Sequence, residues 1–566
     1  MTTSDVAALL DRARRWAAED PDPRTRAELE RLVEAVDGGA DATDLANRFD
    51  GTLEFGTAGL RGALGAGPNR MNRVVVIRAA AGLAAYLREQ SDRHQSTRDQ
   101  SVREQGSPRE DAVVIGYDAR HNSDVFARDT AEVMTGAGFR AYVLPRPLPT
   151  PILAFAIREL GCVAGVMVTA SHNPPEDNGY KVYLGDGSQI VPPADAGIAA
   201  QIAAVGAVAD VPRGSSGVVL DEHLVDRYLD TVAELATDGP RDLDIVYTPL
   251  HGVGGASVAQ VLETAGFDTP RMVSEQEHPD ADFPTVSFPN PEEPGAMDLA
   301  MALAAKHGAD LVVANDPDAD RCAAAVPDPH GWRMLRGDEV GALLARHLLQ
   351  SGKQGTYATT IVSSSLLAKM AADAGQPYVE TLTGFKWIGR VDGLAFGYEE
   401  ALGYCVDPEH VRDKDGVSAL LLLCEMAARA KAEGRTLVDE LDDIATRFGL
   451  HATDQLSVRV SDLGEIAAAM DRLRRTPPTS LGGLAVEGVD DLAEGSADLP
   501  PTEGLRYRLA DGARVIVRPS GTEPKLKCYL EVVIAVNPED GVDAARISAA
   551  GRLDALRDGI KAAAGI

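Results

Sequence analysis

The sequence predicts an α/β protein built from several domains. Short apolar runs rich in β-branched residues alternate with helical stretches, a pattern typical of parallel α/β units repeated over three domains. The runs that predict strands are residues 113–117, 163–168, 244–247, 311–314 and 357–362. A chain of 566 residues is also long enough to form three to four separate cores.

Two segments lie outside these repeats. Val6, Leu9, Leu10 and Trp16 recur near one face of a helical period, so the N-terminal residues predict an amphipathic helix. Residues 89–110 are rich in Ser, Gln, Arg and Glu and hold almost no apolar side chains. That composition predicts a mobile surface insertion.

A serine stands directly after the predicted strand at residues 163–168, within the sequence Thr-Ala-Ser-His-Asn-Pro. Open α/β sheets bind ligands at the carboxyl ends of their strands, so the hydroxyl of Ser171 is placed to meet a substrate. The loop therefore predicts a serine that carries a phosphoryl group. A Ser-His-Asp hydrolase is one alternative, but no Gly-x-Ser-x-Gly elbow surrounds Ser171 and His172 is its immediate neighbour. An ordinary polar loop without a catalytic role is the second alternative.

Three carboxylates follow the predicted strand at residues 311–314, at the alternate positions Asp316, Asp318 and Asp320. Carboxylate oxygens without a nearby Cys or His pattern favour a hard cation, so this loop predicts a Mg²⁺ site. The Gly and the distant Glu of an EF-hand are missing. An exposed acidic turn is the alternative interpretation.

A third segment, residues 518–527, reads Arg-Pro-Ser-Gly-Thr-Glu-Pro-Lys-Leu-Lys after a strand-like run at residues 513–517. Guanidinium, hydroxyl and ammonium groups around a glycine can hold a phosphate that does not react. No Gly-x-x-x-x-Gly-Lys-[Ser/Thr] sequence occurs, which argues against a P-loop enzyme. A basic surface turn is the alternative.

Lysine is used sparingly, because only ten of the 55 basic residues are lysines. Half of them lie in candidate site segments: Lys181, Lys386, Lys414, Lys525 and Lys527. Lysine offers a compact charge and can release a proton when its pKa is depressed, whereas arginine stays charged. We therefore expect lysine where this difference matters to the chemistry.

Composition excludes several classes of protein. The net charge of −31 disfavours nucleic acid and anionic membranes as partners. No apolar run is long enough to span a bilayer and no signal sequence begins the chain, so we expect a cytoplasmic protein.

The five cysteines have no Cys-x-x-Cys spacing and are expected to be reduced core residues. The sequence carries no signal for an oligomeric state.

The motifs, taken in order, resemble the α-D-phosphohexomutase superfamily, and more closely its branch of type 2 phosphoglucomutases and phosphopentomutases. The match runs from Gly-Thr-Ala-Gly-Leu-Arg-Gly at residues 56–62 through the Ser171 and Asp316 loops to Gly384, Glu399, Lys414 and the segment at 518–527. The resemblance implies three related mixed α/β domains and a smaller C-terminal α+β domain around a central cleft. The expected boundaries are 1–215, 216–330, 331–446 and 447–566.

The resemblance also implies the roles of single residues. Ser171 is similar to the phosphoserine, and Asp316, Asp318 and Asp320 to the Mg²⁺ ligands, with a phosphoserine oxygen completing the site. Lys414 resembles a general acid or base, supported by His172 and Lys181, while Arg61 and Arg321 would steady the charge. The residues that resemble sugar and phosphate contacts are Thr383, Gly384, Glu399, Arg518, Ser520, Gly521, Thr522 and Lys527.

One loop departs from the hexose pattern of the family. The usual Gly-Glu-Glu-Ser reads Tyr398-Glu399-Glu400-Ala401 here, so a hydroxyl that would contact the sugar is missing at Ala401. A hydrogen bond of this kind can carry much of the discrimination between related substrates.

The function implied is a mutase that interconverts sugar 1-phosphate and sugar 6-phosphate through a phosphoserine and a bisphosphorylated sugar. Glucose phosphates are the first expectation and mannose phosphates the second. A phosphopentomutase acting on ribose 1-phosphate and ribose 5-phosphate is the alternative. A metal-dependent phosphatase and a phosphosugar-binding regulator are the remaining alternatives. Glucose 1,6-bisphosphate or a similar bisphosphate would serve as activator and intermediate.

Overall fold

A computed structural model of the protein describes residues 3–57, 59–97, 111–329, 331–460, 463–497, 499–520 and 525–566. The chain divides into two compact units. The first unit holds Met1–Met334 and Asp407–Glu425, and the second holds Leu335–Val406 and Met426–Ile566. Within the described residues, no helix combines the length and the apolar character needed to cross a membrane.

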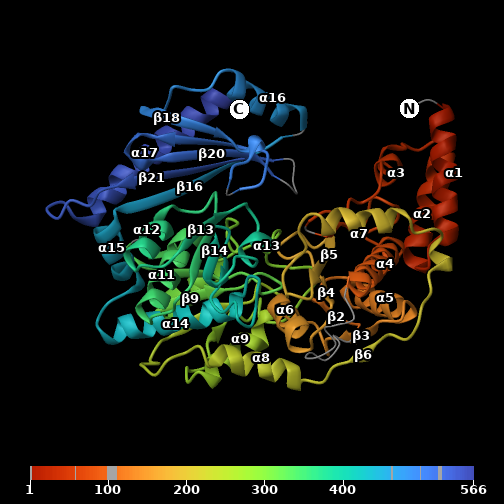
Figure 1. Cartoon of the computed structure of the whole chain (residues 1–566), viewed down its shortest axis with the longest axis horizontal. Coiled ribbons are helices and arrows are strands. Elements are labelled where there is room, and N and C mark those ends of the chain that lie inside the picture. Colours follow the sequence, from red (N-terminus) through yellow and green to blue (C-terminus); the bar gives the residue numbers. More distant parts are fainter. Residues whose placement is uncertain are drawn as a thin grey trace. The chain divides into compact units, whose positions relative to one another are not determined.

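Three helices begin the chain: α1 (Thr3–Glu19), α2 (Pro23–Asp37) and α3 (Thr43–Arg48). Helices α1 and α2 pack against each other (Figure 1). Their small core contains Leu9, Leu10 and Leu29, with Val6 and Trp16 packed at its edge. The predicted amphipathic N-terminal helix is therefore confirmed.

The first α/β domain is built on a six-stranded sheet in the order β1-β5-β4-β2-β3-β6. Its strands are β1 (Leu60–Ala63), β2 (Ala112–Tyr117), β3 (Arg140–Val143), β4 (Ala164–Val168), β5 (Asp177–Leu184) and β6 (Val218–Val219). Its helices are α4 (Arg73–Thr97), α5 (Ser123–Gly136), α6 (Thr150–Glu159) and α7 (Ala194–Ala203). Every residue of β4 is buried, as its continuous apolar sequence predicts for a central strand.

The second and third sheets have the orders β11-β10-β9-β7-β8 and β13-β12-β14-β15. The strands of the second are β7 (Ile245–Thr248), β8 (Arg271–Met272), β9 (Leu311–Ala314), β10 (Ala323–Asp328) and β11 (Gly331–Met334). Those of the third are β12 (Thr356–Thr360), β13 (Tyr378–Thr381), β14 (Leu394–Glu399) and β15 (Gly403–Cys405). The accompanying helices are α8 (His223–Ala233), α9 (Gly254–Thr264), α10 (Asp298–His307), α11 (Gly337–Gln350), α12 (Leu366–Asp373), α13 (Phe385–Ile388), α14 (Gly416–Ala432) and α15 (Leu437–Phe448).

The three sheets repeat one arrangement of four strands. Counted along the chain, the first of these four strands (β2, β7 or β12) pairs in parallel with both the second and the third strand. The fourth strand (β5, β10 or β15) pairs antiparallel with the third. The loop between the third and fourth strands holds Ser171 in the first domain, Asp316 in the second and Glu400 in the third. The expectation of three related mixed α/β domains is confirmed, and the repeat gives these motifs equivalent positions.

The antiparallel fourth strand was not part of the parallel pattern predicted from the alternation of strands and helices. A parallel return needs a crossover of a dozen or more residues, and the loop at 169–176 is too short for one. The short loop therefore forces β5 to run antiparallel to β4, and it holds Ser171 tightly at the edge of the sheet.

The C-terminal domain is a fully antiparallel sheet in the order β16-β21-β20-β19-β18-β17. Its elements are β16 (Leu450–Arg459), α16 (Leu463–Arg475), β17 (Ser480–Leu481), β18 (Leu484–Asp491), β19 (Leu505–Leu509), β20 (Arg514–Pro519), β21 (Lys525–Ile534) and α17 (Gly541–Ala564). Helices α16 and α17 share its hydrophobic core. The expected smaller α+β domain is confirmed, whereas the exact boundaries of all four domains stay a prediction.

The surface insertion expected at residues 89–110 is only partly correct. Helix α4 extends through the first part of this segment, to Thr97. The rest of the segment, 98–110, lies outside the described residues. All five cysteines are buried, as expected for core residues, and none of them forms a disulfide.

Candidate active site

Ser171 lies in the tight turn that follows β4 and is nearly fully buried. Its backbone is left-handed, with a φ of 52°, a conformation that costs a non-glycine residue about 1 kcal/mol. The backbone N–H of Ser171 donates to Thr169 Oγ1 at 2.9 Å. Its side-chain Oγ lies 3.1 Å from Nδ1 of His172. The surrounding contacts thus hold one hydroxyl in a strained and defined position.

Arg120, which the sequence analysis did not single out, holds this turn in place. It follows β2, the strand beside β4, and is 4% exposed. Its guanidinium donates to the carbonyl oxygens of Ser171 at 2.6 Å and Pro174 at 2.8 Å. Further bonds reach the carbonyls of Asn173 and Asp177. Arg120 is therefore the main support of the serine turn.

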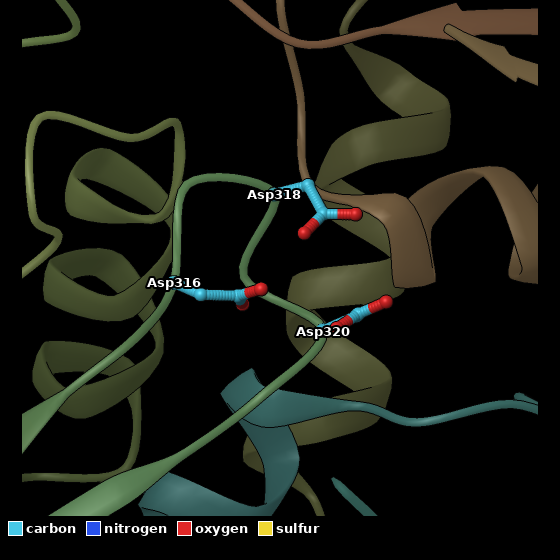
Figure 2. Close-up of side chains that lie close together, drawn as sticks. All are labelled: Asp316, Asp318 and Asp320. Atoms are coloured by element: carbon cyan, nitrogen blue, oxygen red, sulfur yellow. The ribbon is translucent and has the colours of Figure 1, made fainter. Parts of the chain in front are cut away.

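The acidic loop between β9 and β10 is fully buried rather than an exposed turn. Asp316, Asp318 and Asp320 each have no exposed surface, and one carboxylate oxygen from each lies within 4.8 Å of the others. The three side chains project from one turn of the chain, and their carboxylates turn toward a common space (Figure 2). The exposed acidic turn, which was the alternative to a metal site, is therefore wrong.

The serine turn and the acidic loop meet directly. Ser171 Oγ donates a hydrogen bond of 2.8 Å to Asp316 Oδ2. Thr150, the first residue of α6, donates its hydroxyl to Asp318 Oδ2 at 2.6 Å. The nucleophile candidate of the first domain thus faces the carboxylates of the second.

Two lysines bind the same carboxylates. Lys181 Nζ, from β5, lies 2.7 Å from Asp318 Oδ2 and 3.0 Å from Asp320 Oδ2. Lys414 Nζ lies 3.1 Å from Asp320 Oδ2. Within the described residues, Oδ1 of Asp318 and Oδ1 of Asp320 are buried without a hydrogen-bond partner. Unsatisfied buried carboxylate oxygens fit a cation, because only a cation or a donor would offset their desolvation.

The charges of the site shift the pKa values of its members in different directions. Burial raises the pKa of Asp316, and the Asp320 carboxylate raises it further. Burial acts in the same way on Asp320, but the ammonium groups of Lys181 and Lys414 outweigh it and hold the pKa of Asp320 below its usual value. Desolvation and the guanidinium groups of Arg321 and Arg61 hold the pKa of His172 well below its usual value, so His172 is neutral near pH 7.

Lys414 reaches the acidic loop through the segment that leads into α14. Asp413 accepts hydrogen bonds from the Tyr183 hydroxyl at 2.7 Å and from Gln189 at 2.9 Å. Asp415 accepts one from the Tyr228 hydroxyl at 2.8 Å and caps the first turn of α14. A Cβ at Gly416 would lie 2.2 Å from the carbonyl oxygen of Arg321, so glycine is needed for this close approach.

Arg61 and Arg321 also belong to this cluster. Arg61 lies in β1, which pairs with the serine-proximal end of β5, and donates to Asn173 Oδ1 at 3.2 Å. Arg321 Nε lies 3.8 Å from carboxylate oxygens of Asp316 and Asp320. All nine residues predicted for catalysis and metal binding are therefore brought together within the first unit: Arg61, Ser171, His172, Lys181, Asp316, Asp318, Asp320, Arg321 and Lys414.

The residues predicted for the sugar and the second phosphate lie in the other unit. Glu399 is the last residue of β14 and is 7% exposed. Thr383 and Gly384 precede α13, and Gly384 has a φ of 111° that favours glycine. Within the described part of the chain, the Thr383 hydroxyl is buried without a hydrogen-bond partner.

The described residues of the phosphate segment lie at the end of β20 and the beginning of β21. Arg518 and Lys527 are directly opposite each other across the two strands. The backbone N–H of Ser520 donates to the carbonyl oxygen of Lys525 at 2.8 Å. Arg518 hydrogen-bonds Tyr529, whose hydroxyl also lies in the electrostatic range of Glu399 and Glu400. Gly521 and Thr522 lie outside the described residues.

The combined geometry supports group transfer through Ser171. A buried hydroxyl is fixed beside carboxylates that can hold a cation, and lysine and arginine side chains surround it. Phosphoryl transfer needs mainly positioning and compensation of charge, which this arrangement supplies. A Ser-His-Asp triad is not formed, because the Ser171 hydroxyl donates to Asp316 and not through a histidine relay to an aspartate.

Family models match four successive parts of the chain. They are described as phosphoglucomutase/phosphomannomutase α/β/α domain I at residues 52–208, domain II at 226–331, domain III at 336–448, and the C-terminal domain at 456–535. Together the matches cover more than half of the chain.

Known proteins resemble the chain over most of its length. The probable phosphomannomutase of Haemophilus influenzae is 49% identical over 489 residues, which is 85% of this chain and 96% of that protein. The probable phosphoribomutase of Schizosaccharomyces pombe is 36% identical and covers 91% of this chain and 92% of its own. A crystal structure of a phosphoglucomutase/phosphomannomutase family protein from Burkholderia thailandensis has a TM-score of 0.67 at 20% identity, covers 90% of this chain and 97% of its own, and supports the fold.

Proposed function

Since the chain belongs to the phosphoglucomutase/phosphomannomutase family and is a phosphomutase, we propose that it moves a phosphoryl group between C1 and C6 of a hexose through phosphorylated Ser171. Glucose phosphates are the first choice of substrate and mannose phosphates the second. The observation that carries the proposal is the 2.8 Å hydrogen bond from Ser171 Oγ to Asp316 Oδ2. It joins the phosphate carrier to the acidic loop.

The reaction runs in two transfers. In the first, the free hydroxyl oxygen of the sugar monophosphate attacks the phosphorus on Ser171, the P–Oγ bond breaks, and Lys414, in its neutral form, takes the hydroxyl proton as general base. The bisphosphorylated sugar then turns. In the second transfer, Ser171 Oγ accepts the other phosphoryl group, and Lys414 returns the proton to the sugar oxygen. Each transfer conserves the phosphoryl group, so the net reaction is an isomerisation.

Other residues of the first unit supply position and charge. Arg61 and Arg321 steady the anionic phosphoryl group, and Lys181 holds Asp318 and Asp320 in place. The neutral His172 ring lies beside the Ser171 hydroxyl and orients it. Asp316, Asp318, Asp320 and an oxygen of phosphorylated Ser171 would hold Mg²⁺, which when bound neutralises charge on the transferring group.

Residues of the second unit bind the remainder of the substrate. Glu399 accepts hydrogen bonds from sugar hydroxyls, with Thr383 and Gly384 beside the sugar. The phosphate that is not reacting is held by Arg518, Ser520, Gly521, Thr522 and Lys527. This loop must accept the phosphate from either end of the sugar, and flexible ammonium together with planar guanidinium groups suits that task.

A phosphopentomutase is the second candidate, and Ala401 favours it. Ala401 removes a hydroxyl that would contact a hexose, and relatives of the chain are named for mannose, ribose, pentose and glucose phosphates. Loss of one hydrogen bond at a site of this kind can change the preference between sugars.

The experiment that tests the function follows the purified protein by ³¹P NMR with Mg²⁺ and a trace of bisphosphorylated sugar. Glucose 1-phosphate, mannose 1-phosphate and ribose 1-phosphate are offered in parallel. We expect fast conversion of glucose 1-phosphate to its 6-phosphate. Conversion of ribose 1-phosphate alone would assign the pentose activity. Net release of inorganic phosphate would indicate a phosphatase, and no interconversion would overturn the proposal.

Lys414→Arg tests the role of lysine as acid and base. Arginine keeps the positive charge beside Asp320 but does not release its proton, so we expect kcat to fall about 100-fold or more. Lys306→Arg is the matched control, because Lys306 is an exposed lysine of α10 in the same unit. Steady-state turnover of both variants is the measurement. Undiminished turnover of Lys414→Arg would remove the assignment.

We also propose a cytoplasmic location and small-molecule phosphosugars as the partners. Five buried cysteines that form no disulfide suit a reducing compartment. The net charge of −31 disfavours nucleic acid and anionic membranes.

A further inference from the structure

The sugar loop carries a second carboxylate beside Glu399. Glu400 follows β14 directly and is partly exposed. It stands between the predicted sugar contact Glu399 and Ala401, where the hydroxyl is missing. Glu400 therefore offers a polar side chain directly beside both positions in the loop.

One oxygen of the Glu400 carboxylate is held by the end of β12 and the loop that follows it. Its Oε2 accepts hydrogen bonds from Ser363 Oγ at 3.0 Å and Thr360 Oγ1 at 3.2 Å. The backbone N–H of Glu400 donates to Ser363 Oγ at 3.1 Å. Among the described residues, no other side chain donates to Oε1. The carboxylate is thus held by one oxygen while the other remains available for a ligand.

The loop that holds Glu400 is itself anchored. Arg514 of β20 donates to the carbonyl oxygens of Ile361 and Ser363, and pairs with Glu531 of β21. Glu531 in turn accepts from the Ser364 hydroxyl at 2.7 Å. These buried contacts leave the Thr360 and Ser363 hydroxyls little freedom, so Glu400 is positioned before any substrate binds.

A purely structural role does not require a carboxylate at this position. Burial, together with the nearby carboxylates of Glu399 and Asp338, raises the pKa of Glu400 to about 7. A glutamine would accept the same hydroxyl bonds without this repulsion. Tyr529 and the Arg518 that hydrogen-bonds it are close by. Glu400 therefore belongs electrostatically to the group of residues proposed to bind the sugar and its phosphate.

We propose that Glu400 contacts a sugar hydroxyl and determines which sugar phosphate is preferred, in place of the hydroxyl that Ala401 lacks. This inference rests on the proposed mutase function. A hexose monophosphate carries one more free hydroxyl than a pentose monophosphate, so we expect conversion of hexose phosphate to depend on Glu400 more strongly than conversion of pentose phosphate does.

The test compares kcat/KM for glucose 1-phosphate and ribose 1-phosphate in the wild-type enzyme, Glu400→Ala and Glu400→Gln. For Glu400→Ala we expect kcat/KM to fall about 10- to 100-fold for the hexose and less than about threefold for the pentose. Glu400→Gln should shift the ratio in the same direction while keeping the bonds to Ser363. Glu487→Ala, at an exposed glutamate of β18 in the same unit, is the control.

A second variant distinguishes a substrate contact from a folding defect. Adding Ala401→Ser to Glu400→Ala restores a hydroxyl to the loop, and we expect it to recover hexose conversion at least about threefold. An unchanged ratio in both single variants, or an equal fall for both sugars without rescue, would overturn the role of Glu400. Absence of any mutase activity in the wild-type enzyme would overturn the proposed function itself, so the two failures are distinguishable.

Discussion

Ser171→Ala should abolish turnover, with a fall in kcat of at least about 1,000-fold, because it removes the hydroxyl proposed to carry the phosphoryl group. The variant also loses the hydrogen bond to Asp316 Oδ2, but that bond contributes only about 1–3 kcal/mol, so the protein should stay folded. Substrate binding should be largely intact, because the proposed sugar and phosphate contacts lie in other loops. Mutase assays and isothermal titration with glucose 1-phosphate measure the two effects.

Ser257→Ala is the matched control for this variant. Ser257 is another buried serine of the first unit, and within the described residues its hydroxyl has no hydrogen-bond partner. Its removal should leave kcat unchanged. Intact mass after incubation with glucose 1,6-bisphosphate should reveal one phosphoryl group on the control and none on Ser171→Ala. A variant that keeps near-normal kcat would refute the phosphoserine role.

The sequence was sufficient to find the chemical groups of the site because each stands in a local pattern. Ser171 and Asp316 directly follow buried apolar strands, and the ends of such strands are where α/β sheets bind ligands. Neither sequence pattern predicts how close the two loops lie in the folded protein. That proximity depends on how the first and second domains pack, which single-strand periodicity does not encode.

Supporting residues were missed for a related reason. Arg120 and Thr150 act from loops and helix ends that are distant in sequence from the groups they hold, and an isolated arginine or threonine has no distinctive pattern. Knowledge of the strand order would have revealed Arg120, since it stands at the carboxyl end of the strand next to β4. Glu400 belongs to a recognisable sequence motif, but the motif does not predict its contact with Ser363. That contact depends on the pairing of β12 with β14.

Asp318→Asn should raise the Mg²⁺ concentration needed for half-maximal activity about tenfold and lower kcat by about 100-fold or more. Asparagine keeps the shape of the side chain but removes one of the three charges that would hold the cation. Asp318 is a sensitive position because its Oδ1 has no hydrogen-bond partner within the described residues, while its Oδ2 already binds Lys181 and Thr150. Activity measured over a Mg²⁺ titration reports both changes.

Thermal stability gives a readout that is independent of catalysis. A cation that binds only the folded protein stabilises it by about 2.7 kcal/mol at a concentration 100 times its Kd, so Mg²⁺ should raise the Tm of the wild-type protein by a few degrees. The same addition should shift Asp318→Asn much less, whereas Asp268→Asn, at an exposed aspartate of the first unit, should respond like the wild type. Because Lys181 and Lys414 already neutralise part of the acidic loop, the cation must compete with two ammonium groups for Asp318 and Asp320. If chelation and Mg²⁺ leave both the Tm and the activity of the wild-type protein unchanged, these lysines alone balance the carboxylates and the metal site does not exist.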